Sequence, residues 1–319
     1  MAKARLMAKV RAHGIIGQVA DWIEAWLTER KQRVVLNGSC SSWRSVFSGV
    51  PQGSILGPTL FVIFINDIDL ALDLTDLFLS KFADDTKAAR VVDTDAEAAR
   101  LQNDLDGFAQ WAREWQMLFN VDKCKVIHVG RTNPRRNYTM EGKQLIKVEE
   151  EKDLGVMVHQ SLKPGAQVAK AVKKANEVLG QLIRAFTYRD KYIFIQLYKV
   201  YVRCHLEYAI QCCSPYLEQD IQAIEDVQRR AIRQVSGITE SYEEKLEKVG
   251  LTTLQDRRVR GDLIQTFKIM HQVDDIPVDT FFQVAGANHD HATRQAVTVT
   301  QEGGTSNMNL AMPRANLEV

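Results

Sequence analysis

Two adjacent carboxylates, Asp84 and Asp85, lie between two short apolar runs, residues 77–79 and 88–92. A polar pair between two apolar runs predicts a β-hairpin with the acidic pair at its turn. A rigid turn that carries paired carboxylates is the arrangement that two-metal nucleotidyl transfer requires. Because Asp-Asp is also an ordinary solvated turn, the pair by itself leaves both interpretations open.

The segments upstream of this hairpin predict two helices and a second hairpin. Residues 18–30 have the apolar spacing of an amphipathic helix. Residues 34–47 read as a hairpin around the turn signal Asn37-Gly38. Residues 58–72 are apolar nearly all round, as expected for a buried helix.

Downstream of the acidic pair, Thr94 and Glu97 form a capping box that predicts the start of a long helix. Apolar residues follow at steps of three and four, and we expect the tryptophans among them to face the core. These residues are Leu101, Leu105, Phe108, Trp111, Trp115 and Leu118. Residues 124–129 then read as a strand that returns to the sheet. The order helix, hairpin, helix, strand predicts an α+β fold, an antiparallel sheet with helices on one face.

The second half of the chain has a different pattern. Residues 131–162 are turn-rich and strand-like, and helical periodicity begins after Pro164. The helices expected there cover residues 165–187, 191–210, 218–236, 241–249 and 253–273. After Ala285 the chain becomes polar, which is typical of a disordered tail.

Composition excludes few classes of function. The chain has 319 residues, enough for two domains, and its 41 Lys and Arg balance 40 Asp and Glu, so net charge does not indicate an anionic partner. No apolar run approaches the roughly 20 residues of a membrane span, so we expect an intracellular protein without a membrane partner.

Five cysteines without regular spacing fit a reducing compartment. Cys204, Cys212, Cys213 and His205 match no standard zinc spacing, so buried thiols are expected.

A second motif lies upstream of the acidic pair, at residues 49–58. With it, the run SGVPQGSILGPTLFVIFINDI followed by KFADDTK resembles the reverse transcriptase of non-LTR retrotransposons, in particular the jockey-like group. The resemblance continues through residues 111–123 and 151–156 and reaches about residue 260. Cys213 lies where this family usually has Trp.

The resemblance implies an RNA-directed DNA polymerase that acts on an RNA template, a DNA primer and deoxynucleoside triphosphates. Asp84 would be the main metal ligand and Asp85 its support, and hard oxygen ligands suit Mg²⁺ or Mn²⁺. Lys123 would position the triphosphate or protonate the leaving pyrophosphate, where negative charge builds. An exposed surface lysine is the alternative for Lys123.

The upstream motif would contact the incoming nucleotide and the template, because glycines let the backbone approach a ligand closely. The residues implied in that contact are Gly49, Pro51, Gln52 and Gly53. A plain turn before a helix is the alternative interpretation of this motif.

A primer grip would be formed by Leu154, Gly155 and Val156, although a simple hairpin would have the same sequence. Phosphate neutralisation supplies most sequence-independent affinity for nucleic acid. The lysines expected to follow the duplex backbone are Lys163, Lys170, Lys173 and Lys174. A solvated helix face is the alternative for these lysines and equally for Arg229, Arg230 and Arg233. Asp67, Asp104 and Asp106 are expected to be helix-surface carboxylates, and His289, Asp290 and His291 have no expected role.

By resemblance, residues 1–130 would be a partial polymerase palm, 131–162 a primer-grip-like connection, 163–273 an all-helical thumb-like domain and 274–319 the tail. The family carries a further catalytic aspartate on a strand just before the segment that residues 5–10 match, and we expect this chain to begin too late to contain it.

We therefore expect a reverse transcriptase fragment that is inactive by itself. The missing strand should leave a sheet edge beside the Asp84 hairpin exposed, so the palm part should fold poorly, whereas the helical part has local contacts. One alternative is a non-catalytic nucleic-acid-binding or interaction protein derived from a retroelement. A conceptual translation without a stable product is a third.

Overall fold

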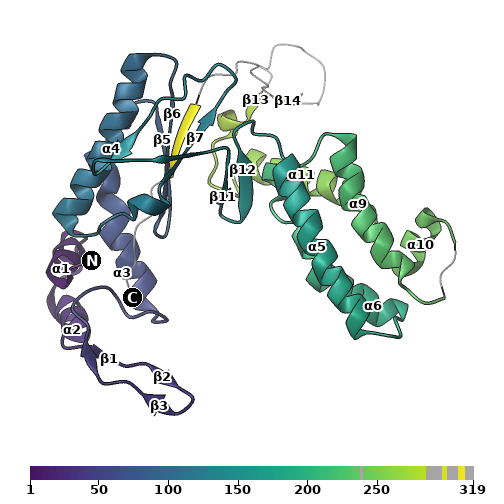
Figure 1. The fold of residues 1–319 in the computed structure, drawn as a ribbon, viewed down its shortest axis with the longest axis horizontal. Coiled ribbons are helices and arrows are strands. Elements are labelled where there is room, and N and C mark those ends of the chain that lie inside the picture. Colours follow the sequence, from purple (N-terminus) through teal and green to yellow (C-terminus); the bar gives the residue numbers. More distant parts are fainter. Residues whose placement is uncertain (238–239, 285–296, 300–307, 313–319) are drawn as a thin grey trace. The chain divides into compact units, whose positions relative to one another are not determined.

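The computed structural model describes residues 1–237, 240–284, 297–299 and 308–312 of the chain. These residues belong to two compact units (Figure 1). The first unit contains Met1–Glu149 and the C-terminal residues from Thr305, and the second contains Glu150–Gly304. The division between the units falls inside the segment 131–162 that was expected to be a connection. Most of the expected tail, including His289, Asp290 and His291, lies outside the described residues.

The first unit begins with two helices and a hairpin; the second helix and the hairpin were predicted, whereas the first helix was not. The elements are α1 (Lys3–Ala12), α2 (Gly17–Leu27), β1 (Lys31–Gln32), β2 (Val35–Leu36), β3 (Ser39–Cys40) and β4 (Arg44–Ser45). Strands β2 and β3 pair across Asn37 and Gly38, whose φ angles of 49° and 81° are those of a tight hairpin turn. Only part of the apolar stripe of α2 is buried. Ile23 and Leu27 are buried, whereas Trp22 is exposed.

A five-stranded sheet forms the centre of this unit. Its strands are β5 (Leu77–Phe82), β6 (Asp85–Val91), β7 (Lys125–Val129), β10 (Ile146–Val148) and β15 (Met308–Met312), in the order β10-β7-β15-β6-β5. Strands β5 and β6 form the predicted antiparallel hairpin. Strand β15 is antiparallel to both of its neighbours, β6 and β7.

Two expectations for this sheet are wrong. Strand β10 pairs with β7 in parallel, so the sheet is not purely antiparallel. The reason is that residues 130–145, with β8 (Thr139–Met140) and β9 (Lys143–Gln144), are long enough to cross over and return in the same direction. The edge of β6 that was expected to be exposed is paired with β15.

The helices α3 (Leu56–Ile65) and α4 (Asp95–Trp115) and the 3₁₀ segments η1 (Asn66–Ala71) and η2 (Val121–Lys123) complete the unit. The capping box at the start of α4 is present, because Thr94 Oγ1 accepts from Glu97 N and the Glu97 carboxylate accepts from Thr94 N. Helix α4 ends at Trp115, since Gln116 is left-handed with φ 54°. Leu118 therefore lies beyond the helix and is exposed, in contrast to its predicted core position.

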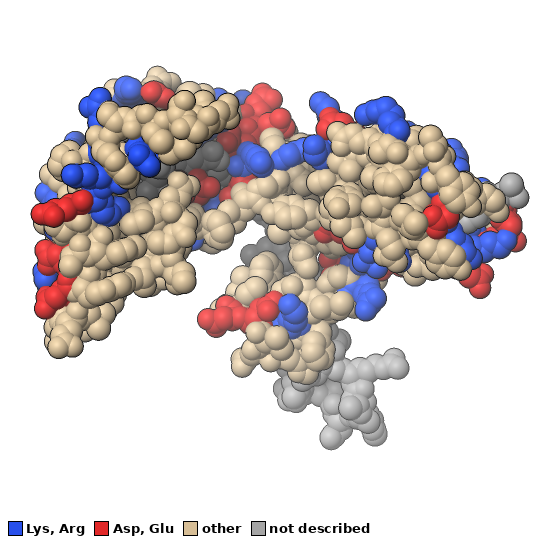
Figure 2. Space-filling view, turned by 90° about the horizontal axis from the view of Figure 1, so that it is seen from below, with Lys and Arg blue, Asp and Glu red and all other residues tan. Residues whose placement is uncertain are grey.

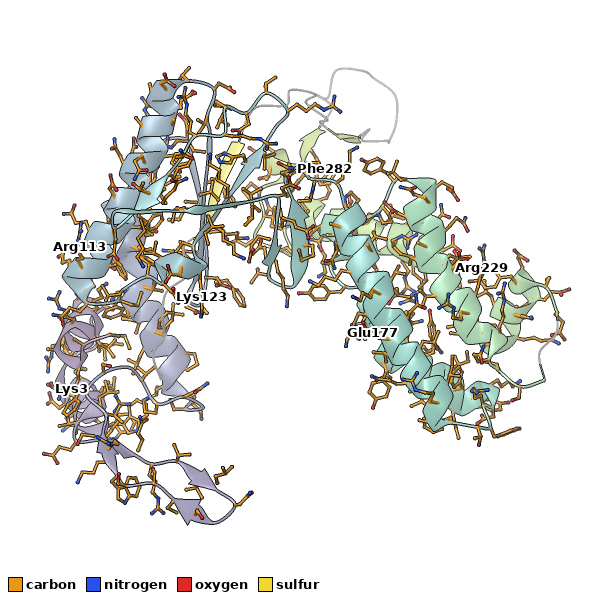
Figure 3. All side chains as sticks on the ribbon, viewed as in Figure 1. Lys3, Arg113, Lys123, Glu177, Arg229 and Phe282 are labelled. Carbon is orange, nitrogen blue, oxygen red and sulfur yellow. The ribbon has the colours of Figure 1, made fainter. Side chains whose placement is uncertain are left out.

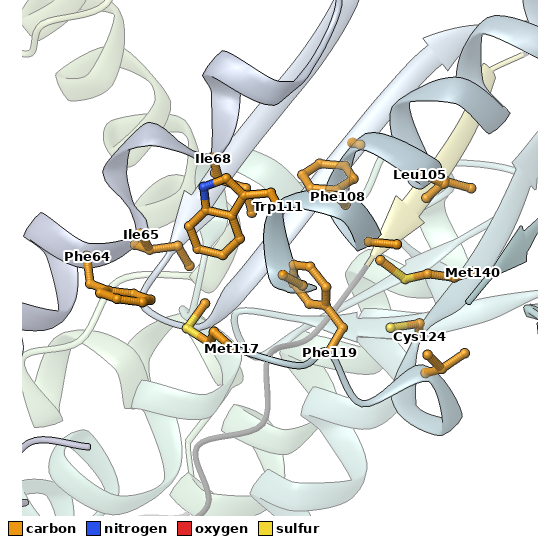
Figure 4. Close-up of a cluster of buried hydrophobic side chains, with 14 of the residues drawn as sticks. Phe64, Ile65, Ile68, Leu105, Phe108, Trp111, Met117, Phe119, Cys124 and Met140 are labelled. Carbon is orange, nitrogen blue, oxygen red and sulfur yellow. The ribbon is translucent and has the colours of Figure 1, made fainter. Parts of the chain in front are cut away.

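Aromatic and aliphatic side chains from α3, α4 and the segment after α4 form the core (Figure 4). Trp111 is buried and meets Phe64 edge to face, with ring centroids 6.1 Å apart. Phe108 meets Phe119 in the same way at 6.1 Å. Such geometry adds about 0.5–1.5 kcal/mol to the burial of the rings.

A buried ammonium group fixes α1 on this core. Lys9 Nζ donates to Phe64 O at 2.6 Å and to Asp67 Oδ1 at 2.5 Å, and it lies 3.7 Å from the ring centroid of Trp115. Asp67 also accepts from Trp111 Nε1 at 3.1 Å. Desolvation lowers the pKa of Lys9, although Asp67 opposes the shift. Asp67 is therefore an ion-pair partner, and the prediction of a surface carboxylate is wrong.

The second unit is helical apart from short strands. It contains β11 (Glu150–Asp153), β12 (Val156–His159), α5 (Gly165–Ala185), α6 (Lys191–Leu197), the π-helical segment η3 (Tyr198–Val202), α7 (Arg203–Leu206), α8 (Ile210–Cys213), α9 (Glu218–Arg233), α10 (Tyr242–Val249), α11 (Leu254–Met270), η4 (Val278–Thr280), β13 (Phe282–Val284) and β14 (Val297–Val299). The predicted helices match these positions, except that the segment 191–210 is interrupted after Leu206.

The predicted buried thiols of this segment are wrong. Cys204 and Cys212 are exposed and Cys213 is partly exposed. Cys204 lies before the end of the helix, at an exposed position of α7. For Cys212 and Cys213 the cause is local, because the chain leaves the helix after Leu206 and turns at Ala209, which has φ 55°. The apolar stripe of α6 therefore does not continue to these cysteines.

The core of the second unit contains a buried polar network. The Glu225 carboxylate accepts from Leu254 N at 2.9 Å, from Gln228 Nε2 at 3.1 Å and from Tyr242 Oη. Gln228 in turn accepts from Tyr198 Oη at 2.9 Å. These bonds join α9 to η3, to α10 and to the start of α11.

Candidate active site and nucleic-acid interface

The acidic pair occupies the turn between β5 and β6. Phe82 pairs with Asp85, so the turn consists of Ala83 and Asp84, and Ala83 is left-handed with φ 51°. Both carboxylates are partly exposed. Along β6 the side chains alternate, with Thr86 buried on the face opposite to that of Asp85. The structure therefore presents Asp84 and Asp85 at the tip of a paired hairpin, as the sequence predicted.

A buried ion pair fixes this hairpin to α4. Arg90 on β6 donates from Nε and Nη2 to Asp104 Oδ2 at 3.2 and 3.0 Å, and each residue is 2% exposed. Arg90 also donates to the carbonyls of Asp73 and Thr75 at 2.9 and 2.6 Å. Burial raises the pKa of Asp104, while its bonds to Arg90 act in the opposite direction.

Asp104 was expected on a helix surface and this expectation is wrong, because its position on α4 faces the sheet beside Leu101 and Leu105. Asp106, on the opposite face of the helix, is exposed as predicted. An isolated acidic residue inside an apolar helical stripe was the available signal for Asp104, since a charge on a buried face needs a partner.

Lys123 lies at the same end of the sheet as the acidic turn. In the register, Ala311 of β15 faces both Ala88 of β6 and Val126 of β7. Strands β6 and β7 therefore run in the same direction, and their first residues, Asp85 and Lys125, lie at the same end of the sheet. Lys123 comes two residues before β7 begins. Lys123 is exposed on η2 at this end of the sheet (Figure 3).

The loop before α3 is held by main-chain contacts with the N-terminal helices and turns. Gly49 and Gly53 are left-handed with φ 75° and 78°, which suits glycine. Gly49 N donates to Met1 O at 3.0 Å, and Arg30 Nη2 donates to Gly49 O at 2.6 Å. Gln52 and Gly53 are exposed, whereas Pro51 is partly buried.

Two residues that the sequence did not single out shape this loop. Ser54 Oγ donates to Pro51 O at 2.7 Å and accepts from Gly57 N at 3.0 Å. A Cβ on Gly57 would lie 2.9 Å from Pro51 O, so only glycine fits. Gly57 belongs to the same decapeptide, and its glycine spacing was the available signal.

The loop and strand β5 contact opposite ends of α3. The loop enters the helix at its N-terminus, and Lys81, close to the acidic turn, donates to Asn66 O at 2.8 Å just past its C-terminus. A helix of 10 residues is about 15 Å long. The loop before α3 and the β5–β6 hairpin therefore belong to the same unit but lie at different ends of α3.

The predicted primer-grip residues form the turn between β11 and β12 in the second unit. Leu154 and Gly155 are left-handed with φ 43° and 92°. Tyr208 Oη donates to Leu154 O at 2.5 Å, and Lys170 Nζ donates to Gly155 O at 3.0 Å. A Cβ on Gly155 would lie 3.0 Å from Tyr208 Oη. Tyr208 was missed, because nothing in its local sequence marks a contact 54 residues away.

The predicted phosphate-binding lysines have different environments. Lys163 and Lys173 are exposed, and Lys174 is exposed but lies 3.6 Å from Glu177. Lys170 is partly buried against Gly155, and desolvation lowers its pKa, with Lys152 adding to the shift. Lys and Arg form several separate patches, interrupted by Asp and Glu, on the face drawn in Figure 2.

The three arginines of α9 are partly engaged with neighbouring side chains. Arg229 Nη1 donates to Asp226 at 3.1 Å, and Arg230 Nη1 donates to Asn176 Oδ1 at 2.9 Å. Arg233 is exposed. None of these contacts distinguishes a nucleic-acid surface from a solvated helix face.

Among the described residues there is no group of three or more His, Cys, Asp or Glu side chains placed to hold a metal ion. Within the same part of the chain, no helix has the length and apolarity of a membrane span.

Comparison with known proteins gives one family and several relatives. The reverse transcriptase (RNA-dependent DNA polymerase) family matches residues 3–179. The chain is 31% identical over 236 residues to the RNA-directed DNA polymerase from mobile element jockey of Drosophila funebris, covering 69% of this chain and 25% of that protein. It is 26% identical over 228 residues to the jockey protein of Drosophila melanogaster, covering 67% of this chain and 25% of that protein.

A third relative is the probable RNA-directed DNA polymerase from transposon BS of Drosophila melanogaster, 26% identical over 226 residues that cover 67% of this chain and 25% of that protein. The chain spans about a quarter of the length of the curated relatives it matches. The similarity to jockey-like elements that the motifs predicted is therefore confirmed.

Proposed function

The chain belongs to the reverse transcriptase family, and on that premise we propose that it is a segment of an RNA-directed DNA polymerase of a non-LTR retrotransposon. The observation that carries this proposal is the acidic pair at the tip of a sheet hairpin, with Lys123 at the same end of the sheet. The family match includes this hairpin and the loop before α3.

Asp84 and Asp85 would hold Mg²⁺ or Mn²⁺. The family uses divalent metal ions, and Mg²⁺ in such sites is bound by one or two carboxylates together with substrate phosphates. Two partly exposed carboxylates at a turn fit that donor set, although a site for two ions needs further ligands. When bound, the ions would activate the primer hydroxyl and stabilise the charge on the leaving group.

The protein residues around the pair would orient and hold the substrates. The Arg90–Asp104 pair fixes the base of the hairpin that carries the carboxylates to α4. Lys123 is exposed at the same end of the sheet and would supply positive charge or a proton to the pyrophosphate. Gln52 and Gly53 are exposed in the loop and would contact the incoming nucleotide and the template.

In the second unit, the turn Leu154-Gly155 would contact the primer. The bonds from Tyr208 and Lys170 give this turn a fixed main chain, which a primer grip requires. We assign Lys170 to holding the turn, and Lys163 and Lys173 to the phosphate backbone. Such contacts would give affinity that falls steeply with salt.

We propose that the isolated chain does not extend a primer, because two carboxylates provide an incomplete site for two ions. The test is a fusion with an upstream segment of a related reverse transcriptase that carries the fingers and the aspartate-bearing strand. The fusion should extend a labelled primer on an RNA template only with Mg²⁺ or Mn²⁺. Asp84→Asn should abolish extension, and Lys123→Ala should slow it by about 100-fold.

Asp106→Asn is the matched control, since Asp106 is an exposed carboxylate on the outer face of α4 and should leave the rate unchanged. A fusion that folds and binds primer–template but incorporates no nucleotide would contradict the polymerase assignment. That outcome would favour the second candidate function, a non-catalytic nucleic-acid-binding protein. The observation that favours this second candidate is that the described residues contain no group of three or more side chains placed to hold a metal ion.

A further inference from the structure

The turn Leu154-Gly155 is contacted by a side chain from a distant part of the second unit. Tyr208 Oη donates to Leu154 O at 2.5 Å, although 54 residues separate the two. A Cβ on Gly155 would lie 3.0 to 3.2 Å from Oη, Cε1 and Cζ of Tyr208, so the ring lies directly against the main chain of the turn. The place of Tyr208 therefore limits where the turn can lie.

Helix α5 holds the same hairpin by two further bonds. Lys170 Nζ donates to Gly155 O at 3.0 Å, and Gln167 Oε1 accepts from Met157 N at 2.9 Å. Gln167 is 6% exposed, so its bond is shielded from water. The hairpin is thus held by one long helix and, through Tyr208, by the connection between α7 and α8.

That connection has a strained main chain. Helix α7 ends at Leu206 and α8 begins at Ile210, so residues 207–209 join them. Within the connection Ala209 is left-handed, with φ 55° and ψ 41°. A residue other than glycine keeps such a main chain only where its surroundings fix it. The connection that carries Tyr208 therefore needs a contact that holds it in place.

An ion pair with α11 supplies this contact. Arg257 donates from Nε and from Nη2 to the two carboxylate oxygens of Glu207, the second bond at 3.1 Å. Arg203 Nε, four residues before Glu207, lies 3.5 Å from the same carboxylate. A pair with two parallel bonds fixes the direction of both side chains as well as their distance.

The exposure of this pair indicates that it acts locally. The side chains of Glu207 and Arg257 are 20% and 31% exposed. An ion pair that water reaches adds little to the stability of a whole unit. Glu207 directly precedes Tyr208 in the chain, so a fixed Glu207 sets the direction in which the Tyr208 side chain leaves the main chain.

We infer that Glu207 and Arg257 are positioning residues for the turn Leu154-Gly155 and that they act through Tyr208. The role of the turn rests on the proposed function, in which it contacts the primer. Helix α11 thereby takes part in placing the primer, although it contributes no side chain to the turn itself. Arg257 and Tyr208 act in series, so losing either one releases the same contact.

The experiment measures amide hydrogen exchange in the full chain without nucleic acid. Tyr208→Phe removes the bond to Leu154 O, and Arg257→Met removes both bonds to Glu207. Each variant should accelerate exchange in residues 153–157 by about 10-fold, the factor that corresponds to the loss of one hydrogen bond. The double variant should exchange no faster than the faster single variant. Protection in α9 should stay unchanged.

Arg260→Met is the matched control, since Arg260 is exposed three residues further along α11 and should leave the exchange of residues 153–157 unchanged. Arg257→Lys keeps the charge without the two-bond geometry, so it should give an intermediate rate and serves where Arg257→Met does not fold.

Three results overturn the inference. The first is unchanged exchange of residues 153–157 in Tyr208→Phe or in the Arg257 variants. The second is equal acceleration in α9, which would show an ion pair that only stabilises the helical unit. The third is a double variant that exchanges faster than both single variants, which would show that Arg257 and Tyr208 act independently.

The fusion with an upstream reverse transcriptase segment separates the inference from its premise. Tyr208→Phe and Arg257→Met should raise the KM for primer–template by about 10-fold and leave the KM for deoxynucleoside triphosphates unchanged, because the turn would contact only the primer. Accelerated exchange together with an unchanged KM for primer–template would support the positioning of the turn and contradict its role as a primer grip.

Discussion

Asp104 in the first unit and Glu225 in the second are buried carboxylates that are satisfied in different ways. In the first unit, Asp104 meets the guanidinium of Arg90, and both are 2% exposed. In the second unit, Glu225 receives its hydrogen bonds from neutral donors on Tyr242, Gln228 and the main chain of Leu254. Asp104 is thus hydrogen-bonded to a full charge. Glu225 is hydrogen-bonded to neutral groups, and the buried guanidinium of Arg258 acts on it electrostatically.

The difference matters for the stability of the two units. The ion pair of the first unit lies near the end of β6, where Arg90 pairs with Leu77, the first residue of β5. Removing one charge therefore leaves the other buried at the base of the hairpin, at the end opposite the acidic turn. The network of the second unit shares its carboxylate among three donors, so loss of one bond leaves the others in place. The base of the acidic hairpin thus depends on the opposite charges of Arg90 and Asp104. The network of the second unit distributes the hydrogen bonds of its carboxylate over neutral groups.

The largest expected effect is the loss of one member of the ion pair. Arg90→Met should destabilise the first unit by about 3–5 kcal/mol, because Asp104 would remain buried without a counter-charge. The double variant Arg90→Met/Asp104→Leu should recover most of this loss. Residue-resolved hydrogen exchange should show the change in residues 77–91 and not in α5 or α9. A double variant as unstable as the single one would contradict this assignment.

A smaller effect is expected from the two left-handed turn residues. Gly155→Ala should destabilise the β11–β12 hairpin by about 2 kcal/mol, since φ is 92° and the new Cβ would lie 3.0 Å from Tyr208 Oη. Ala83→Gly at the acidic turn should have the opposite sign, a gain of up to about 1 kcal/mol, because Ala83 has φ 51°. Denaturant unfolding measures the change in the free energy of unfolding of both variants. A change of the same sign in the two variants would contradict this prediction.

A third prediction concerns the neutral donors of the second unit. Tyr242→Phe removes one bond to Glu225 and should cost about 1.5 kcal/mol, less than the loss of a charged partner in the first unit. Thermal unfolding followed by hydrogen exchange in α9 and α10 would measure it. A loss of unfolding free energy equal to that of Arg90→Met would show that the two networks are equally sensitive to the removal of one partner.

The smallest effect is a pH dependence that both units share. Main-chain N–H donors at the helix starts lower the pKa of Glu97 in α4 and of Glu244 in α10. Because the folded-state pKa lies below the ordinary value of 4.5, each cap stabilises its helix above that pH and loses this contribution as the pH falls through the lowered pKa.

Amide exchange in the first turns of α4 and α10, followed from about pH 6 to about pH 3, should therefore show fraying of both helices. Glu97→Gln and Glu244→Gln keep an acceptor and should remove the pH dependence of their own helix. If the helix of a Gln variant frays with the same pH dependence as in the unaltered chain, a group other than the replaced glutamate is responsible.

Local patterns were sufficient to predict most helices and the acidic hairpin. The capping box at Thr94 and the turn signal at Asn37-Gly38 were present as predicted, because such features depend on residues three or four positions apart. The family followed from the motifs around Gln52 and Asp84, which keep their order and spacing. The roles of these residues in catalysis stay predictions.

Other features could not be predicted because their cause lies far away in the sequence. Asp67 and Asp104 looked like surface carboxylates until Lys9 and Arg90 were found beside them. Tyr208 gave no sign of its bond to Leu154. The periodicity of α6 suggested one long helix, and only the turn at Ala209 showed why Cys212 is exposed.

The sequence by itself determined the family, the positions of the main helices and the hairpin that carries Asp84 and Asp85, since each of these depends on short-range spacing. Only the tertiary structure decided which strand lies beside that hairpin. A strand edge offers the same row of N–H and C=O groups to any extended segment, so pairing is selected by geometry and burial rather than by local sequence. For this reason Met308–Met312, and not a nearby strand, fills the position next to β6.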